Sequence, residues 1–175
     1  MTEEEYKTVK EKIMFVKAWD IVSLILEAFN ATDDYSVLEK HGLKPEKYWE
    51  LIIYAWSIAE MHSSVDDKVN FLHEWVAILE AETPMDKFKE GLPDGEFTIY
   101  RGGHDWGLSW SLDKEIAQWF IDRKVEWEES LGNGNLEPDP LSVLTVTKKD
   151  VCFYETGRKE AEVVLVPKAY WNKMA

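Results

Sequence analysis

The strongest constraint on the fold is a change of sequence pattern at Pro93-Asp94-Gly95, a tripeptide typical of turns. Before it, apolar residues recur at helical spacing, whereas after it the apolar runs are short, β-branched and aromatic. We therefore expect an α+β fold, with a helical N-terminal layer packed on a strand-rich C-terminal half. Residues 1–92 would form the helical part and residues 93–175 the strand-rich part of one domain, 1–175.

The helical part contains three predicted helices and, between the first two, a short helical piece that Gly42 closes. Thr2 and Glu5 fit a capping box at the start of the first. Pro45 suits the first turn of a second helix that runs to about Met61, and a third covers roughly Asp66–Glu80. The residues expected to face inward are Trp49, Ile52, Ile53, Trp56 and Ala59 in the second helix, and Val69, Leu72, Val76 and Leu79 in the third.

The strand-rich part contains five predicted strands and one helix. Asp113 is expected to cap the helix, which runs from Lys114 to about Glu128 with Ile116, Phe120 and Trp127 on its inner face. A loop is predicted over Ser130–Pro140. The predicted strands are Phe97–Tyr100, Leu108–Ser111, Leu141–Thr147, Val151–Tyr154 and Ala161–Val166.

The charge and cysteine content exclude several classes of function. Acidic residues outnumber basic ones 34 to 20, for a formal charge of −14, so we expect no direct nucleic-acid binding. The single cysteine, Cys152, has no partner for a disulfide and no spacing that fits zinc, so no metal is expected. The N-terminus is acidic where a signal peptide would be basic, and the apolar stretch Ile21–Phe29 is too short to span a bilayer. We therefore expect a cytoplasmic protein without a membrane partner.

The first candidate site motif is Tyr100-Arg101-Gly102-Gly103, at the end of a predicted strand. The chain has only three arginines, and a guanidinium can fork onto phosphate oxygens in a way that lysine cannot. Glycines next to it would let a ligand approach the backbone. Taken alone, the motif is better explained by an arginine that pairs with a carboxylate and by glycines that turn the chain.

The second motif, Gly107-Leu108-Ser109-Trp110-Ser111, would place Ser109 and Ser111 on one face of a strand. The two hydroxyls could hold a polar ligand or orient a carboxylate, although a half-exposed edge strand would look similar. The third motif places Glu160 and Glu162 at i and i+2 on one face of a predicted strand, at the start of an apolar run. Such a pair can divide catalytic work between two carboxylates, and its alternative is a solvated strand entry.

The order of these motifs resembles the ADP-ribosyltransferase superfamily, in particular the Arg-Ser-Glu branch of cholera-toxin-like and clostridial enzymes. The runs GLSWSLDKEIAQWF and GRKEAEVVLVP also look like small phage-encoded members, and the resemblance covers Phe97–Pro167. It implies an ADP-ribosyltransferase-like split β-sandwich that acts in the cytoplasm, which would be the host's if the protein is phage-encoded. Trp110 departs from the family pattern, which has threonine between the two serines.

The resemblance also implies a role for each site residue. Arg101, with Gly102, would grip the phosphates of NAD, and Ser109, with Ser111, would position NAD and the catalytic glutamate. Glu162 would be that catalytic glutamate, and Glu160 would contact the acceptor. The residues that could stack on NAD are Trp106, Trp110, Phe120 and Tyr154, and His104 could line the site.

The function implied is a mono-ADP-ribosyltransferase that moves ADP-ribose from NAD to a protein side chain, arginine by the resemblance, and releases nicotinamide. Three alternatives stay open. The acceptor could be water, which makes the protein an NAD glycohydrolase. The chain could also bind a nucleotide without turnover, or be a non-catalytic acidic protein that blocks a basic partner surface.

Overall fold

The computed structural model describes residues 44–58, 75–76, 78–80, 83–103, 107–132, 137–157 and 160–168, together with positions 2, 4, 7–8 and 11. The chain forms two compact units, Met1–Met85 and Asp86–Ala175. The division falls a few residues before the predicted change of pattern at residue 93. That the two units make one domain stays a prediction. In the part of the chain that the structure describes, no helix is both long enough and apolar enough to cross a membrane.

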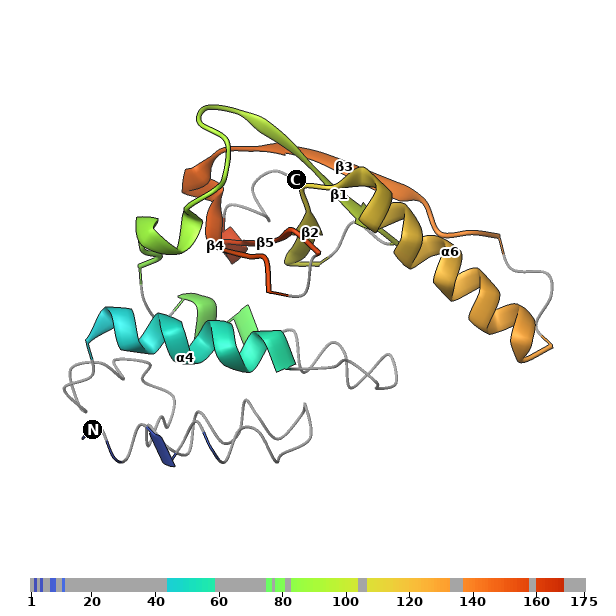
Figure 1. The fold of residues 1–175 in the computed structure, drawn as a ribbon. Helices are drawn as coiled ribbons and strands as arrows, with labels where there is room; N and C mark the ends of the chain where they lie inside the picture. Colours follow the sequence, from blue (N-terminus) through green and yellow to red (C-terminus); the bar gives the residue numbers. More distant parts are fainter. Residues whose placement is uncertain are drawn as a thin grey trace. The chain divides into compact units, whose positions relative to one another are not determined.

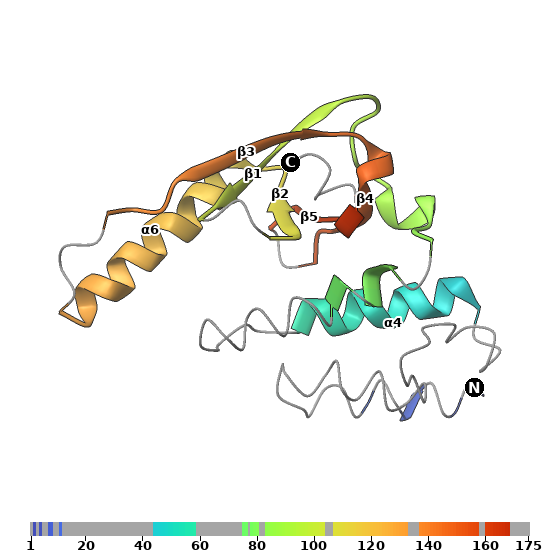
Figure 2. The ribbon, with the colours of Figure 1, turned by 180° about the vertical axis from the view of Figure 1, so that it is seen from behind.

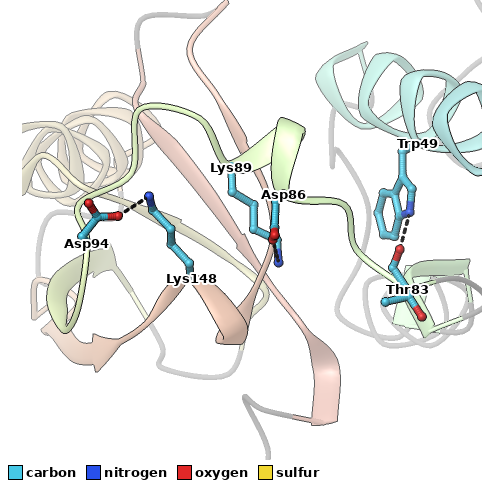
Figure 3. A network of polar contacts seen from close by, with 6 residues as sticks. All are labelled: Trp49, Thr83, Asp86, Lys89, Asp94 and Lys148. Atoms are coloured by element: carbon cyan, nitrogen blue, oxygen red, sulfur yellow. Dashed lines mark hydrogen bonds and ion pairs between the residues drawn. The ribbon is translucent and has the colours of Figure 1, made fainter.

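Within the described residues of the first unit lies helix α4, Pro45–Ile58, which begins at the predicted proline. Tyr48 and Trp49 are buried and also satisfy their polar atoms. The Tyr48 hydroxyl donates to the carbonyl of Ile78 at 2.9 Å, and Trp49 Nε1 donates to the carbonyl of Thr83 at 3.0 Å (Figure 3). The core residues described here are Tyr48, Trp49, Leu51, Ile52, Ala55, Trp75, Ile78 and Leu79.

The predicted inner faces of these helices are confirmed in part. Trp49 and Ile52 are buried, while Ile53 and Trp56 are half-buried. In the third helix Leu79 is buried and Val76 is half-buried. Other parts of these predictions, including Glu5, Ala59, Met61, Val69 and Leu72, lie outside the described residues.

The second unit contains a five-stranded sheet in the order β3-β1-β2-β5-β4, and every neighbouring pair is antiparallel (Figures 1 and 2). The α+β class is therefore confirmed. Each predicted strand is present within one or two residues of its expected bounds. The strands are β1 Phe97–Gly102, β2 Ser109–Ser111, β3 Leu141–Val146, β4 Val151–Glu155 and β5 Glu162–Leu165.

One face of the sheet is apolar because alternate strand residues point to the same side. Ile99, Trp110 and Val163 come from three neighbouring strands, and all are buried. Cys152 is also buried in β4, as expected from its apolar neighbours.

Helix α6, Lys114–Ser130, begins after Asp113, whose side chain accepts a hydrogen bond from the Glu115 N–H at 2.8 Å. The predicted cap is therefore confirmed, but the predicted inner face is wrong. The buried residues are Ala117 and Ile121, whereas Phe120 and Trp127 are 41% and 59% exposed and Ile116 is half-buried.

The reason is the close approach of α6 to β1. A Cβ added at Gly102 would lie only 2.3 Å from the carbonyl oxygen of Ala117 and 3.0 Å from Ile121. A helix that sits this close to a strand buries a small residue, alanine, and turns its aromatic residues outward.

Short 3-10 helices and ion pairs hold the connections in the second unit (Figure 3). In helix η1, Asp86–Lys89, the Nζ atom of the buried Lys89 lies 3.7 Å from Oδ1 of Asp86. Helix η2, Lys148–Asp150, occupies the three residues between the predicted strands Leu141–Thr147 and Val151–Tyr154. Its Lys148 Nζ lies 2.7 Å from Asp94 Oδ1, in the turn that precedes β1. The predicted loop Ser130–Pro140 begins one residue late, because Ser130 ends α6.

Candidate functional site

The three motifs singled out in the sequence lie on three neighbouring strands. Arg101 and Gly102 end β1, Ser109–Ser111 form β2, and Glu162 begins β5. Strand β2 lies between the other two in the sheet. Residues far apart along the chain therefore become neighbours on one short strand.

Ser109 joins the other two motifs through two hydrogen bonds. Its backbone carbonyl accepts from Nη1 of Arg101 at 2.5 Å, and its hydroxyl donates to Oε1 of Glu162 at 2.5 Å. Both bonds involve a charged group, and such bonds are shorter and stronger than neutral ones. The guanidinium and the carboxylate are thus held by the same residue, one through its backbone and the other through its side chain.

Glu162 is the most buried carboxylate among the described residues, with 9% of its surface exposed. The β2–β5 register explains how Ser109 reaches it. Ser111 lies directly opposite Glu162 and Ser109 opposite Val164, so Ser109 is a diagonal neighbour on the same face. A buried carboxylate needs hydrogen-bond donors in place of water, and Ser109 supplies one.

The Arg101 guanidinium packs directly against Gly107. A Cβ added at this residue would lie 2.5 Å from Cζ of Arg101 and 2.7 Å from Nη2, so any other side chain here would displace the guanidinium. The carbonyl of Gly107 is fixed in turn by the indole Nε1 of Trp110, which donates to it at 2.7 Å. Gly107 belongs to the second motif, but its packing against Arg101 was not predicted from the sequence.

The hydroxyl of Ser111 bonds to two backbone groups, and its predicted contact with a ligand stays a prediction. The hydroxyl donates to the carbonyl of Glu160 at 2.7 Å and accepts from the N–H of Asp113 at 3.0 Å. It therefore ties the segment before β5 to the start of α6. The two serines share a face as expected, but only the hydroxyl of Ser109 bonds to a carboxylate.

Glu160 and Glu162 are not consecutive members of one strand. Strand β5 begins at Glu162, and Ala161 has a φ of +47°, in the left-handed region that non-glycine residues rarely adopt. The alternation used to place both glutamates on one face therefore does not hold across Ala161. Glu160 is half-buried and lies in the bend that leads into the strand.

Three other predicted site residues belong to the packing of the second unit. The open side of Gly102 is filled by α6, as described above. Trp110 is only 3% exposed, and its ring lies in the core. Phe120 is exposed on α6, where its ring packs edge-on against Trp119 at a centroid distance of 5.0 Å.

Glu155 is a carboxylate near the site that the sequence did not indicate. It ends β4 directly opposite Glu162 in the β4–β5 ladder. Its Oε1 accepts from the N–H of Gly157 at 2.5 Å. Its position depends on strand pairing, for which the local sequence carries no signal.

Tyr154 is half-buried in β4, and its ring lies against Gly91, where an added Cβ would be 3.2 Å from the ring. The remaining candidates, His104 and Trp106, lie outside the described residues. Among the residues that the structure describes, no group of three or more histidine, cysteine or acidic side chains could hold a metal ion. Comparison of the chain with protein-family models, curated proteins and solved structures found no match.

Proposed function

We propose that this protein is a mono-ADP-ribosyltransferase with an ADP-ribosyltransferase-like split β-sandwich. It would transfer ADP-ribose from NAD to a protein side chain, arginine by the family resemblance, and release nicotinamide. The observation that supports this most is the bridge formed by Ser109 between Arg101 and Glu162. The three residue types that the resemblance assigned to NAD are the three that the sheet brings together.

The buried carboxylate suits the chemistry of this reaction. When the bond between nicotinamide and ribose breaks, its electron pair leaves with nicotinamide and the ribose develops positive charge. A fixed carboxylate stabilises that charge more in the transition state than in the ground state. Because Ser109 holds Glu162 in place, little reorganisation is needed as the charge develops.

Arg101 suits the phosphates of NAD for a related reason. A guanidinium is planar and matches phosphate oxygens with paired donors. Its contacts with Ser109 and Gly107 fix the plane of the group before a ligand arrives. The nitrogen of an acceptor arginine would then bond to the ribose carbon and lose a proton to the carboxylate of Glu160, the residue assigned to that acceptor.

The central test is Glu162→Gln, which keeps the shape of the side chain and removes its charge. We expect nicotinamide release from NAD to fall by at least about 10²-fold, the usual cost of removing an electrostatic stabiliser. Glu96→Gln is the matched control, because Glu96 is exposed and precedes β1. The Glu162→Gln variant should unfold at the same urea concentration as the wild type. If Glu162→Gln still releases nicotinamide at the wild-type rate, the assignment is overturned.

Two measurements separate the proposed function from its alternatives. Nicotinamide release that does not depend on an acceptor protein, with no labelled protein formed from labelled NAD, would indicate an NAD glycohydrolase. Calorimetry that detects no NAD binding would favour the non-catalytic interaction protein. Binding without any nicotinamide release would indicate a nucleotide-binding module.

A further inference from the structure

Helix α6 exposes a row of large aromatic side chains. Trp119, Phe120 and Trp127 are 50%, 41% and 59% exposed. The two buried residues of the helix, Ala117 and Ile121, lie in its N-terminal half. The C-terminal half extends away from the sheet in both views of the fold (Figures 1 and 2).

These aromatic residues lie along one side of the helix. At about 100° per residue, Trp119, Phe120, Arg123 and Trp127 fall within an arc of about 100°, turned away from Ala117 and Ile121. The guanidinium of Arg123 stacks over the Trp119 ring, 5.0 Å from its centroid. We call these three aromatic residues, together with the arginine that stacks on one of them, the aromatic stripe. A row of large exposed apolar side chains is a feature of interaction surfaces on folded proteins.

A row of acidic side chains runs beside the aromatic stripe. It consists of Glu115, Asp122, Glu126 and Glu129, and all four are exposed. Their spacing of seven, four and three residues places them along one side of the helix. Like charges three and four residues apart repel each other, so a cationic partner would relieve this repulsion as well as cover the aromatic rings.

We infer that this face of α6 is a docking surface for a basic amphipathic segment of a partner protein. Lysine or arginine side chains of that segment would pair with the acidic row, and its apolar side chains would cover the aromatic stripe. A second copy of the chain is a poor occupant because each copy carries a charge of −14. Residues 1–90 of this chain fit no better, with 19 acidic and 10 basic residues. The inference does not depend on NAD turnover.

The test uses a labelled synthetic helical peptide of leucine and lysine, with the leucines on one face, and measures its fluorescence anisotropy. We expect Asp122→Lys combined with Glu126→Lys to weaken binding by at least about tenfold, and higher salt to weaken it further. Trp119→Gln combined with Trp127→Gln should weaken it by a similar factor, because the rings supply the apolar contact.

The control separates this surface from general attraction to an acidic protein. Glu90→Lys combined with Glu96→Lys makes the same change of charge at exposed positions of the second unit, outside α6. Circular dichroism establishes that each variant is folded. The proposal is overturned if the control weakens binding as much as the α6 variants do. It is also overturned if a peptide with glutamate in place of lysine binds equally well.

Discussion

Gly107 lies against the guanidinium of Arg101 so closely that a Cβ at residue 107 would be 2.5 Å from Cζ. The same guanidinium donates to the carbonyl of Ser109. Because the Ser109 hydroxyl also donates to Glu162, the absence of one methyl group permits the arrangement that connects three strands. The position of the guanidinium in the site therefore depends on a glycine.

Gly107→Ala should displace Arg101 and break its bond to Ser109. We expect the free energy of unfolding to fall by about 1–3 kcal/mol, as for other overpacked sites, and nicotinamide release to fall with it. The same substitution should cost less in an Arg101→Ala background, where the clash is absent. Urea denaturation of the four proteins measures this coupling, and strictly additive effects would contradict the packing described here.

Ser109→Ala and Ser111→Ala should have different effects, although both remove a hydroxyl from β2. Ser109→Ala removes a donor from the buried carboxylate of Glu162 and should cost about 1.5–3 kcal/mol of stability, along with most of the turnover. Ser111→Ala removes contacts with the backbone only and should cost about 0.5–1.5 kcal/mol for each bond. Equal rates of nicotinamide release, measured under conditions where both variants are folded, would argue against a special role for Ser109.

The corrected inner face of α6 can be tested by a pair of alanine substitutions. Ile121→Ala removes a side chain that is 4% exposed and should lower the free energy of unfolding by about 2–5 kcal/mol. Phe120→Ala removes a larger side chain that is 41% exposed and should change it by no more than about 0.5 kcal/mol. Thermal denaturation that ranks the two in the opposite order would restore the face predicted from the sequence.

The ion pair between Asp94 and Lys148 predicts a pH dependence of stability. The hydrogen bond and positive charge of Lys148 lower the pKa of Asp94 below its usual value. The pair therefore contributes stability at pH values above the usual aspartate pKa, and loses it as the pH falls through the lowered pKa. Lys148→Met should lower Tm slightly at neutral pH, and the difference should vanish in strong acid.

Salt provides a second test of this pair. Asp94 is almost fully exposed, with 97% of its side-chain surface in solvent. Dissolved ions screen such a pair, so the difference in Tm between Lys148→Met and the wild type should also shrink at high ionic strength. A difference that persists unchanged in acid and in salt would have to come from the packing of the Lys148 stem.

The strands and the cap of α6 could be predicted because their signals are local. β-branched runs between turn residues mark β1 and β3, and Asp113 marks the helix start. The apolar spacing of α6 was misleading because Phe120 and Trp127 are large and Ala117 is small. The face that is buried depends on Gly102 in β1, which lets the helix approach the strand with Ala117 and Ile121 at the contact.

In the candidate site, too, the sequence indicated residue types but not contacts between distant segments. The residue types Arg101, Ser109 and Glu162 could be chosen from the sequence, but the strand order that brings them together could not. Glu155 was missed because its position opposite Glu162 is set by the β4–β5 register. Glu160 was placed on a strand face that does not exist, because the left-handed backbone at Ala161 has no signature in the residue itself.

The strand order also determines which part of the sheet opens first. Strands β3 and β4 are the edges, so β1, β2 and β5, which carry Arg101, Ser109 and Glu162, are hydrogen-bonded on both sides. Fraying begins where backbone groups have a partner on one side only. In amide hydrogen exchange the three central strands should therefore retain their protons longest. The site would then be built into the slowest-exchanging segment of the second unit, and would keep its form through fluctuations that release the edges.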